Sequence, residues 1–410
     1  MLWNTLVNRV KEGLPARLAS RVARLRPDLA FFGPSASSRR LLVNGQERSD
    51  ISGIRLPALG YSAPDPIDAA GIAICERLIA AYHLALRSER QGKSSDDMWS
   101  IHAHEYHQEV CRALESRDPS ATLRVLAGMF TDPVTTGLAL GRGTYDACVA
   151  HPRATQLDWH DKAISLGISL GMVAAQCPEQ GEYGTLLDLD SPSVLGMVVK
   201  HLGVSLAPPQ CGGIFGVETM GSIYPVNYLL HICTAHRLRS LIAAAQGSSA
   251  CLEIGGGVGF LAYAALVMGI RRFSIIDLPI SNVLQGYYLL RSQFSDRVRL
   301  YGEPAKEGDS SIDILPTTSI DELPARSFEI AINQDSFPEM GRAVAVNYLR
   351  QLPTLAKTFL SINQESQTRI SDSFSQNWTH QLCAQNPSMR LMYRAPYWMR
   401  KGYVEELYAM

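Results

Sequence analysis

The sequence contains few cysteines, no excess charge of either sign and no hydrophobic run long enough to cross a bilayer. Its 8 cysteines in 410 residues are scattered without a Cys-x-x-Cys pair, which excludes a disulfide framework and a zinc knuckle. The 38 basic and 39 acidic side chains leave a net charge of -1. No part of the chain is basic enough to predict a nucleic-acid partner.

Signals for export and for membrane insertion are also missing. The longest uncharged stretches are 163–178, which is too short for a bilayer, and 254–270, which contains five glycines. Charged side chains at positions 9, 11 and 12 interrupt the apolar residues near the N-terminus, so the pattern of a secretory signal is absent. We therefore expect a cytoplasmic protein with no membrane partner. The segment 3–14 is expected to form an ordinary amphipathic helix and not a membrane-surface helix.

What is present is a globular composition, with 46% apolar and 19% charged residues. Such a chain buries a sizeable core, and its length predicts one large domain or two medium ones. We expect a mostly α-helical N-terminal domain at residues 1–215, for substrate recognition or dimerisation. A bridging or lid helix at 216–247 and an α/β domain at 248–410 would follow.

The pattern of apolar residues changes near residue 247. Before it, apolar residues recur at helical spacing between connectors that contain Pro, Gly and Asp. The expected helices cover residues 68–90, 96–115, 121–130, 158–176 and 193–202, after an irregular connector at 39–66.

After residue 247, short apolar runs alternate with helical segments, which is typical of βαβ units. Two runs at 389–397 and 403–408 are joined through Lys401-Gly402 and predict a β-hairpin. The sequence therefore predicts a Rossmann-like, doubly wound α/β domain with a C-terminal β-hairpin. The expected strands before the hairpin cover 251–254, 273–276, 298–301, 329–333 and 358–362, with helices at 260–268 and 344–355.

A glycine cluster, Glu253-Ile-Gly-Gly-Gly-Val-Gly259, follows the first of these strands. Glycines permit a tight turn and let a ligand approach the backbone, while the next helix offers free N–H groups. A nucleotide is the ligand that this arrangement predicts. Gly257-Val-Gly-Phe-Leu-Ala262 also satisfies the GxGxxA form of the dinucleotide fingerprint, so the motif alone leaves the nucleotide open.

Two carboxylates favour S-adenosylmethionine. Glu253 lies where a negative charge would repel a pyrophosphate but attract the sulfonium and ammonium groups of this cofactor. Asp277 ends the second strand, where it can accept hydrogen bonds from both ribose hydroxyls, a role that suits NAD equally. A dehydrogenase would need a second mononucleotide half after the fingerprint, whereas here one sheet closes with a hairpin. An NAD(P)-dependent oxidoreductase and a non-catalytic, cofactor-retaining interaction protein stay open as alternatives.

Four short segments follow one another in the C-terminal half: 253–259, Ile275-Ile-Asp-Leu-Pro279, Ile332-Asn-Gln-Asp-Ser-Phe-Pro-Glu-Met340 and Phe359-Leu-Ser-Ile-Asn363. In these segments the chain resembles the sugar O-methyltransferase family of class I S-adenosylmethionine-dependent methyltransferases, and the resemblance extends over residues 195–410. It implies a small-molecule acceptor, a sugar or a glycosylated metabolite, and a homodimer is left open. The cofactor contacts expected are Glu253, Gly255, Gly256, Gly257, Gly259, Asp277, Leu278, Asn333 and Tyr228.

Methyl transfer to oxygen is an in-line displacement, so the protein must align the acceptor oxygen with the methyl group and help to remove its proton. Asp335 and Glu339 follow the fourth predicted strand, at the edge of the sheet where ligands bind. We expect Asp335 to be the base or a substrate anchor, with Glu339 second. A helix beginning within 338–344 would place Pro338 in its first turn and let its dipole favour Glu339. The alternative is that Asp335 or Ser336 only caps that helix.

Other residues are weaker candidates. Related plant-type O-methyltransferases with a similar Asp-Leu-Pro segment use a histidine as the base. In this chain the residue at the corresponding spacing is Pro338. A histidine base would have to come from His380 or another distant histidine. His102-Ala-His-Glu-Tyr-His107 is one residue short of the HExxH spacing, so no metal site is predicted. Asp313 is expected in a solvated loop, and Tyr403 in hairpin packing.

A probable helix before the first strand carries further aromatic and polar side chains. Packing is the expected role of each, although Tyr224 and Tyr228 share a face and can line the pocket. The other side chains of this group are Asn227, His231 and His236.

Overall fold

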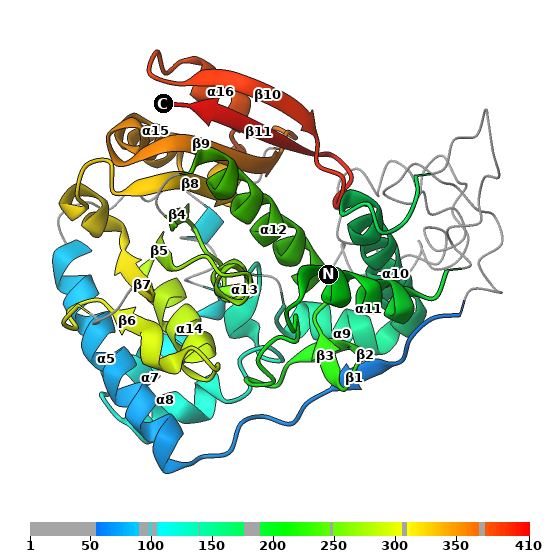
Figure 1. Cartoon of the computed structure of the whole chain (residues 1–410). Helices are drawn as coiled ribbons and strands as arrows, with labels where there is room; N and C mark the ends of the chain where they lie inside the picture. Colours follow the sequence, from blue (N-terminus) through cyan, green and yellow to red (C-terminus); the bar gives the residue numbers. More distant parts are fainter. Residues whose placement is uncertain are drawn as a thin grey trace, which may run out of the picture.

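The computed structural model of the chain describes residues 55–89, 98–99, 105–138, 140–175, 189–246, 249–305, 310–368 and 374–410. The helix expected at 3–14, most of the expected connector at 39–66, and His102 and His104 lie outside the described residues. An eight-stranded sheet organises the described part of the chain (Figure 1).

The strands of this sheet have the order β6-β7-β5-β4-β8-β9-β11-β10. Neighbours from β6 to β9 are parallel, whereas β11 is antiparallel to both β9 and β10. Because β5 lies on one side of β4 and β8 on the other, the winding reverses at β4 and creates a topological switch point. The predicted Rossmann-like, doubly wound fold with its C-terminal hairpin is confirmed. The strands are β4 Ala250–Ile254, β5 Arg272–Asp277, β6 Val298–Leu300, β7 Ser311–Pro316, β8 Phe328–Gln334, β9 Ala356–Gln364, β10 Arg390–Pro396 and β11 Tyr403–Ala409.

Successive residues of the strands enter two different hydrophobic cores, because side chains alternate between the faces of a sheet. Cys251 and Ile275 belong to one core, and Leu252 and Ile276 belong to the other. The first core includes residues of α12, α13 and α14, and the second includes residues of α15 and α16. These helices are α12 Tyr228–Ala245, α13 Phe260–Val267, α14 Pro279–Leu290, α15 Arg342–Leu355 and α16 Thr379–Ala384.

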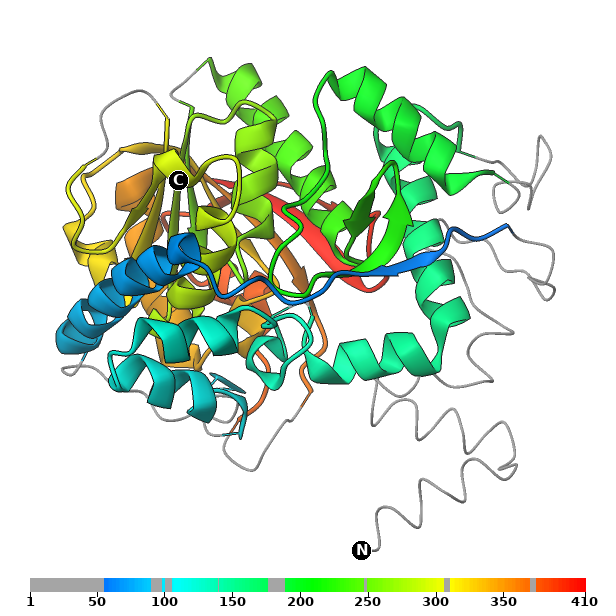
Figure 2. The same ribbon diagram turned by 90° about the horizontal axis from the view of Figure 1, so that it is seen from below.

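The N-terminal helices pack directly on this unit. α5 lies against α14, and its Cys75 and Leu78 share a core with the strands (Figures 1 and 2). The division into domains at residues 215 and 247 stays a prediction. The remaining helices are α5 Ala69–Glu89, α7 Gln108–Glu115, α8 Pro119–Leu126, α9 Arg142–Ala150, α10 Pro152–Ser169 and α11 Ser191–Leu202, with short 3-10 turns η1 Pro133–Thr135, η3 Ser295–Arg297, η4 Thr317–Glu322 and η5 Phe337–Glu339.

By length and composition alone, α5 is the one helix in the described ranges that satisfies the requirements of a membrane span. One face of α5 is nevertheless buried within the protein, at Cys75, Leu78, Tyr82 and neighbouring residues. This one-sided burial is that of an amphipathic helix packed on the core.

Several elements differ from the expectations. The connector expected at 39–66 contains a strand, β1 Leu59–Tyr61, which pairs with β2 Phe215–Thr219. β3 Ser222–Tyr224 completes this small antiparallel sheet (Figure 2). Asp313 lies inside β7 and not in a solvated loop. Its carboxylate is buried and accepts a hydrogen bond from Arg299 Nε at 2.7 Å, which allows a charged side chain in this strand.

The segment after β8 also differs. Pro338 and Glu339 belong to the 3-10 turn η5, and α15 begins only at Arg342, with Gly341 at its N-cap. The alternative capping role is wrong for Ser336, whose hydroxyl donates to the Ile254 carbonyl at 3.0 Å and makes no cap. The dipole of α15 therefore does not act on Glu339 in the way that a helix starting at 338 would.

Candidate active site

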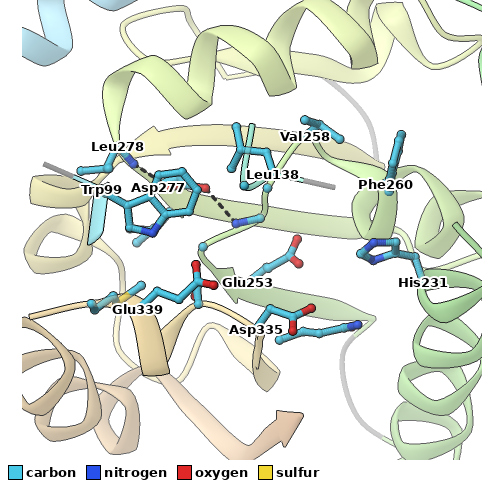
Figure 3. A pocket seen from close by; sticks show the side chains of 18 of the residues that line it. Trp99, Leu138, His231, Glu253, Val258, Phe260, Asp277, Leu278, Asp335 and Glu339 are labelled. Atoms are coloured by element: carbon cyan, nitrogen blue, oxygen red, sulfur yellow. Dashed lines mark hydrogen bonds between the residues drawn. The ribbon is translucent and has the colours of Figure 1, made fainter. Parts of the chain in front are cut away.

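A cavity of about 210 Å³ lies at the carboxyl ends of β4, β5 and β8 (Figure 3). This is the switch point of the sheet, where doubly wound proteins bind their ligands. The wall opposite the sheet comes from the N-terminal half, at Trp99, Gly137 and Leu138. Of the predicted site residues, the cavity brings together Glu253, Gly255, Gly256, Gly257, Asp277, Leu278, Asp335 and Glu339.

The glycine turn between β4 and α13 needs glycine for two reasons. Gly255, Gly257 and Gly259 have φ angles of 75°, 57° and 89°, which L-residues with a Cβ rarely adopt. A Cβ at Gly255 would also overlap the hydroxyl of Ser336. That hydroxyl cannot give way easily, because it is held by Ile254 and by the Asn333 amide. The turn is thus pressed against the segment after β8.

We expect Gly255→Ala to lower the free energy of unfolding by about 2–5 kcal/mol, from overpacking and from the strained backbone together. The measurement is equilibrium denaturation in urea. Gly269→Ala is the matched control, because Gly269 also has a positive φ, 87°, but a Cβ there meets no atom within 4 Å. It should cost only about 1–2 kcal/mol. Equal losses in the two variants would contradict the close contact with Ser336.

Glu253 is the last but one residue of β4, and its side chain lines the cavity although the residue is only 3% exposed. Its Oε2 atom is buried and has no hydrogen-bond partner in the part of the chain that the structure describes. Burial, and then the negative charge of Asp277, raise the pKa of Glu253 well above its ordinary value. A cationic ligand beside this carboxyl would favour its charged form and provide a partner for its buried oxygen.

Asp277 ends β5, and its carboxylate accepts hydrogen bonds from Gly256, Gln285 and Leu278 and a further one from the Ser281 side chain. Oδ2 accepts from the Gly256 N–H at 2.9 Å and from Gln285 Nε2 at 2.7 Å, and Oδ1 accepts from the Leu278 N–H at 2.8 Å. Burial raises the pKa of Asp277 to about 6, and these hydrogen bonds oppose the rise, so the group is ionised at neutral pH. A carboxylate has about four acceptor positions, and Figure 3 shows this one at the cavity wall.

Asp335 and Glu339 have different environments. Asp335 adopts a φ of 71° and accepts a hydrogen bond from Arg400 Nη1 at 2.9 Å. The Arg400 guanidinium lies 4.1 Å from the centre of the Tyr403 ring. Burial, and then the charge of Asp335, raise the pKa of Glu339 to about 8, against the effect of Arg400. Asp335 is therefore a paired carboxylate, whereas Glu339 is mostly protonated at neutral pH.

The sequence did not identify His231, Arg400 or Tyr403 as site residues, yet all three line the cavity. Burial lowers the pKa of His231 to about 4, and its ring lies edge-on to Phe260. The histidine that enters the site is thus His231 of α12. His380 does not line the cavity and contacts Glu406 at 2.6 Å instead.

Three predicted cofactor contacts do not line the cavity. Tyr228 is buried against Phe260, in an edge-on contact of 5.6 Å between ring centres. The Asn333 amide donates to the Ile254 carbonyl at 2.8 Å and accepts from the Phe337 N–H at 3.1 Å. Gly259 is the N-cap residue of α13. These positions support roles in packing and in holding the glycine turn, and direct contact of the three residues with a cofactor stays a prediction.

Metal ligands are not gathered anywhere in the described ranges of the chain, where no three His, Cys, Asp or Glu side chains form a group that could hold an ion. Of the segment 102–107, the structure describes only Glu105, Tyr106 and His107. His107 is buried just before α7.

Comparisons with known proteins give similarity at the level of structure. No protein-family model and no curated protein sequence match the chain. The structure of the mitomycin 7-O-methyltransferase MmcR is similar over 82% of this chain and 95% of its own, with 16% identity and a TM-score of 0.32. A candidate RNA methyltransferase, PH1948 from Pyrococcus horikoshii, is similar over 45% of this chain and 82% of its own, with 15% identity and a TM-score of 0.29. The pyocyanin biosynthetic protein PhzM is similar over 42% and 55%, with 12% identity and a TM-score of 0.30.

Proposed function

We propose that this chain is an S-adenosylmethionine-dependent O-methyltransferase that acts on a hydroxyl group of a sugar or another polar natural product. The observation that carries the proposal is the buried, unpaired carboxyl of Glu253 beside the glycine turn. A dinucleotide would bring a pyrophosphate to this turn, next to an acidic group. The ammonium of S-adenosylmethionine would instead satisfy that group.

The neighbouring residues fit the rest of the cofactor. Asp277, ionised at neutral pH, places a carboxylate at the cavity wall, where a ribose hydroxyl can replace one of its present donors. Beyond it, Leu278, Trp99 and Tyr348 provide an apolar lining suited to an aromatic base. When bound, the cofactor supplies a methyl group on a positively charged sulfur.

Residues at the other end of the cavity suit the removal of a proton from the acceptor. Glu339 is the better general base, because its pKa of about 8 lies near neutral pH. Asp335 is held by Arg400 and suits the role of an anchor for an acceptor hydroxyl. The predicted order of these two carboxylates is therefore reversed in our proposal. The several charged and polar groups there favour a hydroxylated, polar acceptor.

Isothermal titration of the purified chain with S-adenosylhomocysteine, and separately with NAD, tests the proposal. We expect S-adenosylhomocysteine to bind and NAD to give no heat of binding. Binding of NAD alone would support an oxidoreductase and overturn the proposal. An untargeted search of polar metabolites for products heavier by one methylene, after incubation with S-adenosylmethionine, then identifies the acceptor.

A further inference from the structure

Two polar side chains of α12 face the cavity one helical turn apart. Asn227 is the N-cap residue of α12 and His231 follows four residues later, and both line the cavity. Side chains at i and i+4 share a face of a helix. The first turn of α12 therefore presents a polar edge to whatever ligand occupies the cavity.

Asn227 does not perform the usual function of an asparagine at an N-cap. Its side chain makes no capping hydrogen bond, because its Oδ1 atom accepts one from Lys162 Nζ at 2.8 Å. An ammonium group can only donate, so this bond fixes which end of the amide is the oxygen. The Nδ2 group, with two hydrogens to donate, consequently points away from Lys162, and no described residue accepts from it.

Lys162 is itself held by a buried ion pair. Its Nζ atom lies 2.6 Å from Asp158 Oδ2, and the two side chains are 6% and 7% exposed. A buried ion pair contributes little net stability, because both charges lose their hydration. The pair can fix the orientation of Asn227 even if it adds little to the stability of the fold.

The charges around the cavity indicate what the amide would bind. Glu253, whose buried oxygen has no partner among the described residues, favours a cation, whereas α12 places the N-terminal end of an 18-residue helix at the same cavity. Such an end favours an anion. Of the other charged groups near this turn, Asp335 is paired with Arg400, and Asp158 is paired with Lys162. A ligand with an ammonium and a carboxylate on the same carbon would satisfy both requirements.

Resting on the proposed function, we infer that Asn227 and the first turn of α12 bind the carboxylate of the cofactor's methionine moiety. The Lys162 and Asp158 pair of α10 positions the Asn227 amide. The first turn of α12, positioned by α10 of the N-terminal half, would then complete the binding site for the amino-acid end of the cofactor. The sequence motifs for this cofactor, in contrast, lie after residue 250.

Two ligands that differ in the amino-acid moiety test this inference. S-adenosylhomocysteine contains it, and 5′-methylthioadenosine lacks it. By isothermal titration, Asn227→Ala should weaken S-adenosylhomocysteine binding about tenfold and leave 5′-methylthioadenosine binding unchanged. The double variant Asp158→Asn/Lys162→Met removes both buried charges at once, and it should weaken S-adenosylhomocysteine binding less than Asn227→Ala does, again without an effect on 5′-methylthioadenosine.

Asn347→Ala, on the exposed face of α15, is the matched control and should change neither affinity. Unchanged binding of S-adenosylhomocysteine to Asn227→Ala would overturn the inference, since the amide would then serve something other than the cofactor. Equal losses for both ligands would also overturn it, because the substitution would be acting on the whole site. Failure of the unaltered chain to bind either ligand would instead refute the proposed function.

Discussion

Replacing Glu253 with glutamine is expected to weaken binding of S-adenosylhomocysteine by a factor of about 30 or more. Glutamine has nearly the same shape, so the glycine turn is preserved, but it cannot ionise beside a cationic ligand as a carboxyl can. The buried Oε2 atom, which has no partner among the described residues, would no longer be available as a charged partner for the ligand's ammonium group. Isothermal titration measures the loss, and 5′-methylthioadenosine, which has no ammonium group, should keep its affinity.

The same substitution is expected to have the opposite effect on stability. Between the ordinary pKa of a glutamate and the raised pKa of Glu253, the folded chain keeps a proton that the unfolded chain releases. Stability therefore falls as the pH rises through this window. Glu253→Gln should remove this dependence and raise the melting temperature at pH 7 without ligand. A variant that lost both ligand binding and thermal stability would show that Glu253 is structural, contrary to the proposal.

Replacing Glu339 with glutamine is expected to lower kcat about 100-fold or more, because the acceptor hydroxyl would lose its general base. Affinity for S-adenosylhomocysteine should stay within twofold of the original. In the unaltered chain, kcat/KM should rise with pH and level off above about 8, since burial and Asp335 place the pKa of Glu339 there. In the variant this rise should disappear.

Glu322→Gln is the matched control for this prediction, because Glu322 is an exposed acid at the end of η4. It should retain the activity and the pH profile of the unaltered chain. A Glu339→Gln variant with full activity and the same profile would contradict this role. Proton removal would then fall to another titratable side chain of the cavity, such as His231 or Asp335.

The C-terminal fold was predictable where each element has a local pattern. The glycine turn, the strand before it and the carboxylate that ends β5 are read directly from short segments. The helix α14 was missed, because it is buried on all sides and so lacks the apolar stripe that marks a surface helix. β7 was also missed, since its Asp313 resembles a loop residue until Arg299 is placed beside it.

The site was predictable only where one segment supplies it. Glu253 and Asp277 follow from the ends of strands, whereas Arg400 reaches Asp335 across 65 positions of sequence and has no local signature. Asn227 and His231 did carry one, since their spacing places them on one face of a helix. What the sequence could not show is that this face turns toward the cavity and not into the core.

The position of β11 has a consequence for folding during synthesis. β11 lies between β9 and β10, so β10 leaves the ribosome before the strand that joins it to the sheet exists. Arg400 lies in the turn between β10 and β11, and the docking of this hairpin on β9 holds it beside Asp335. The charge balance at the acceptor end of the cavity therefore depends on that docking, and a nascent chain halted before β11 would lack the strand that holds Arg400 in place.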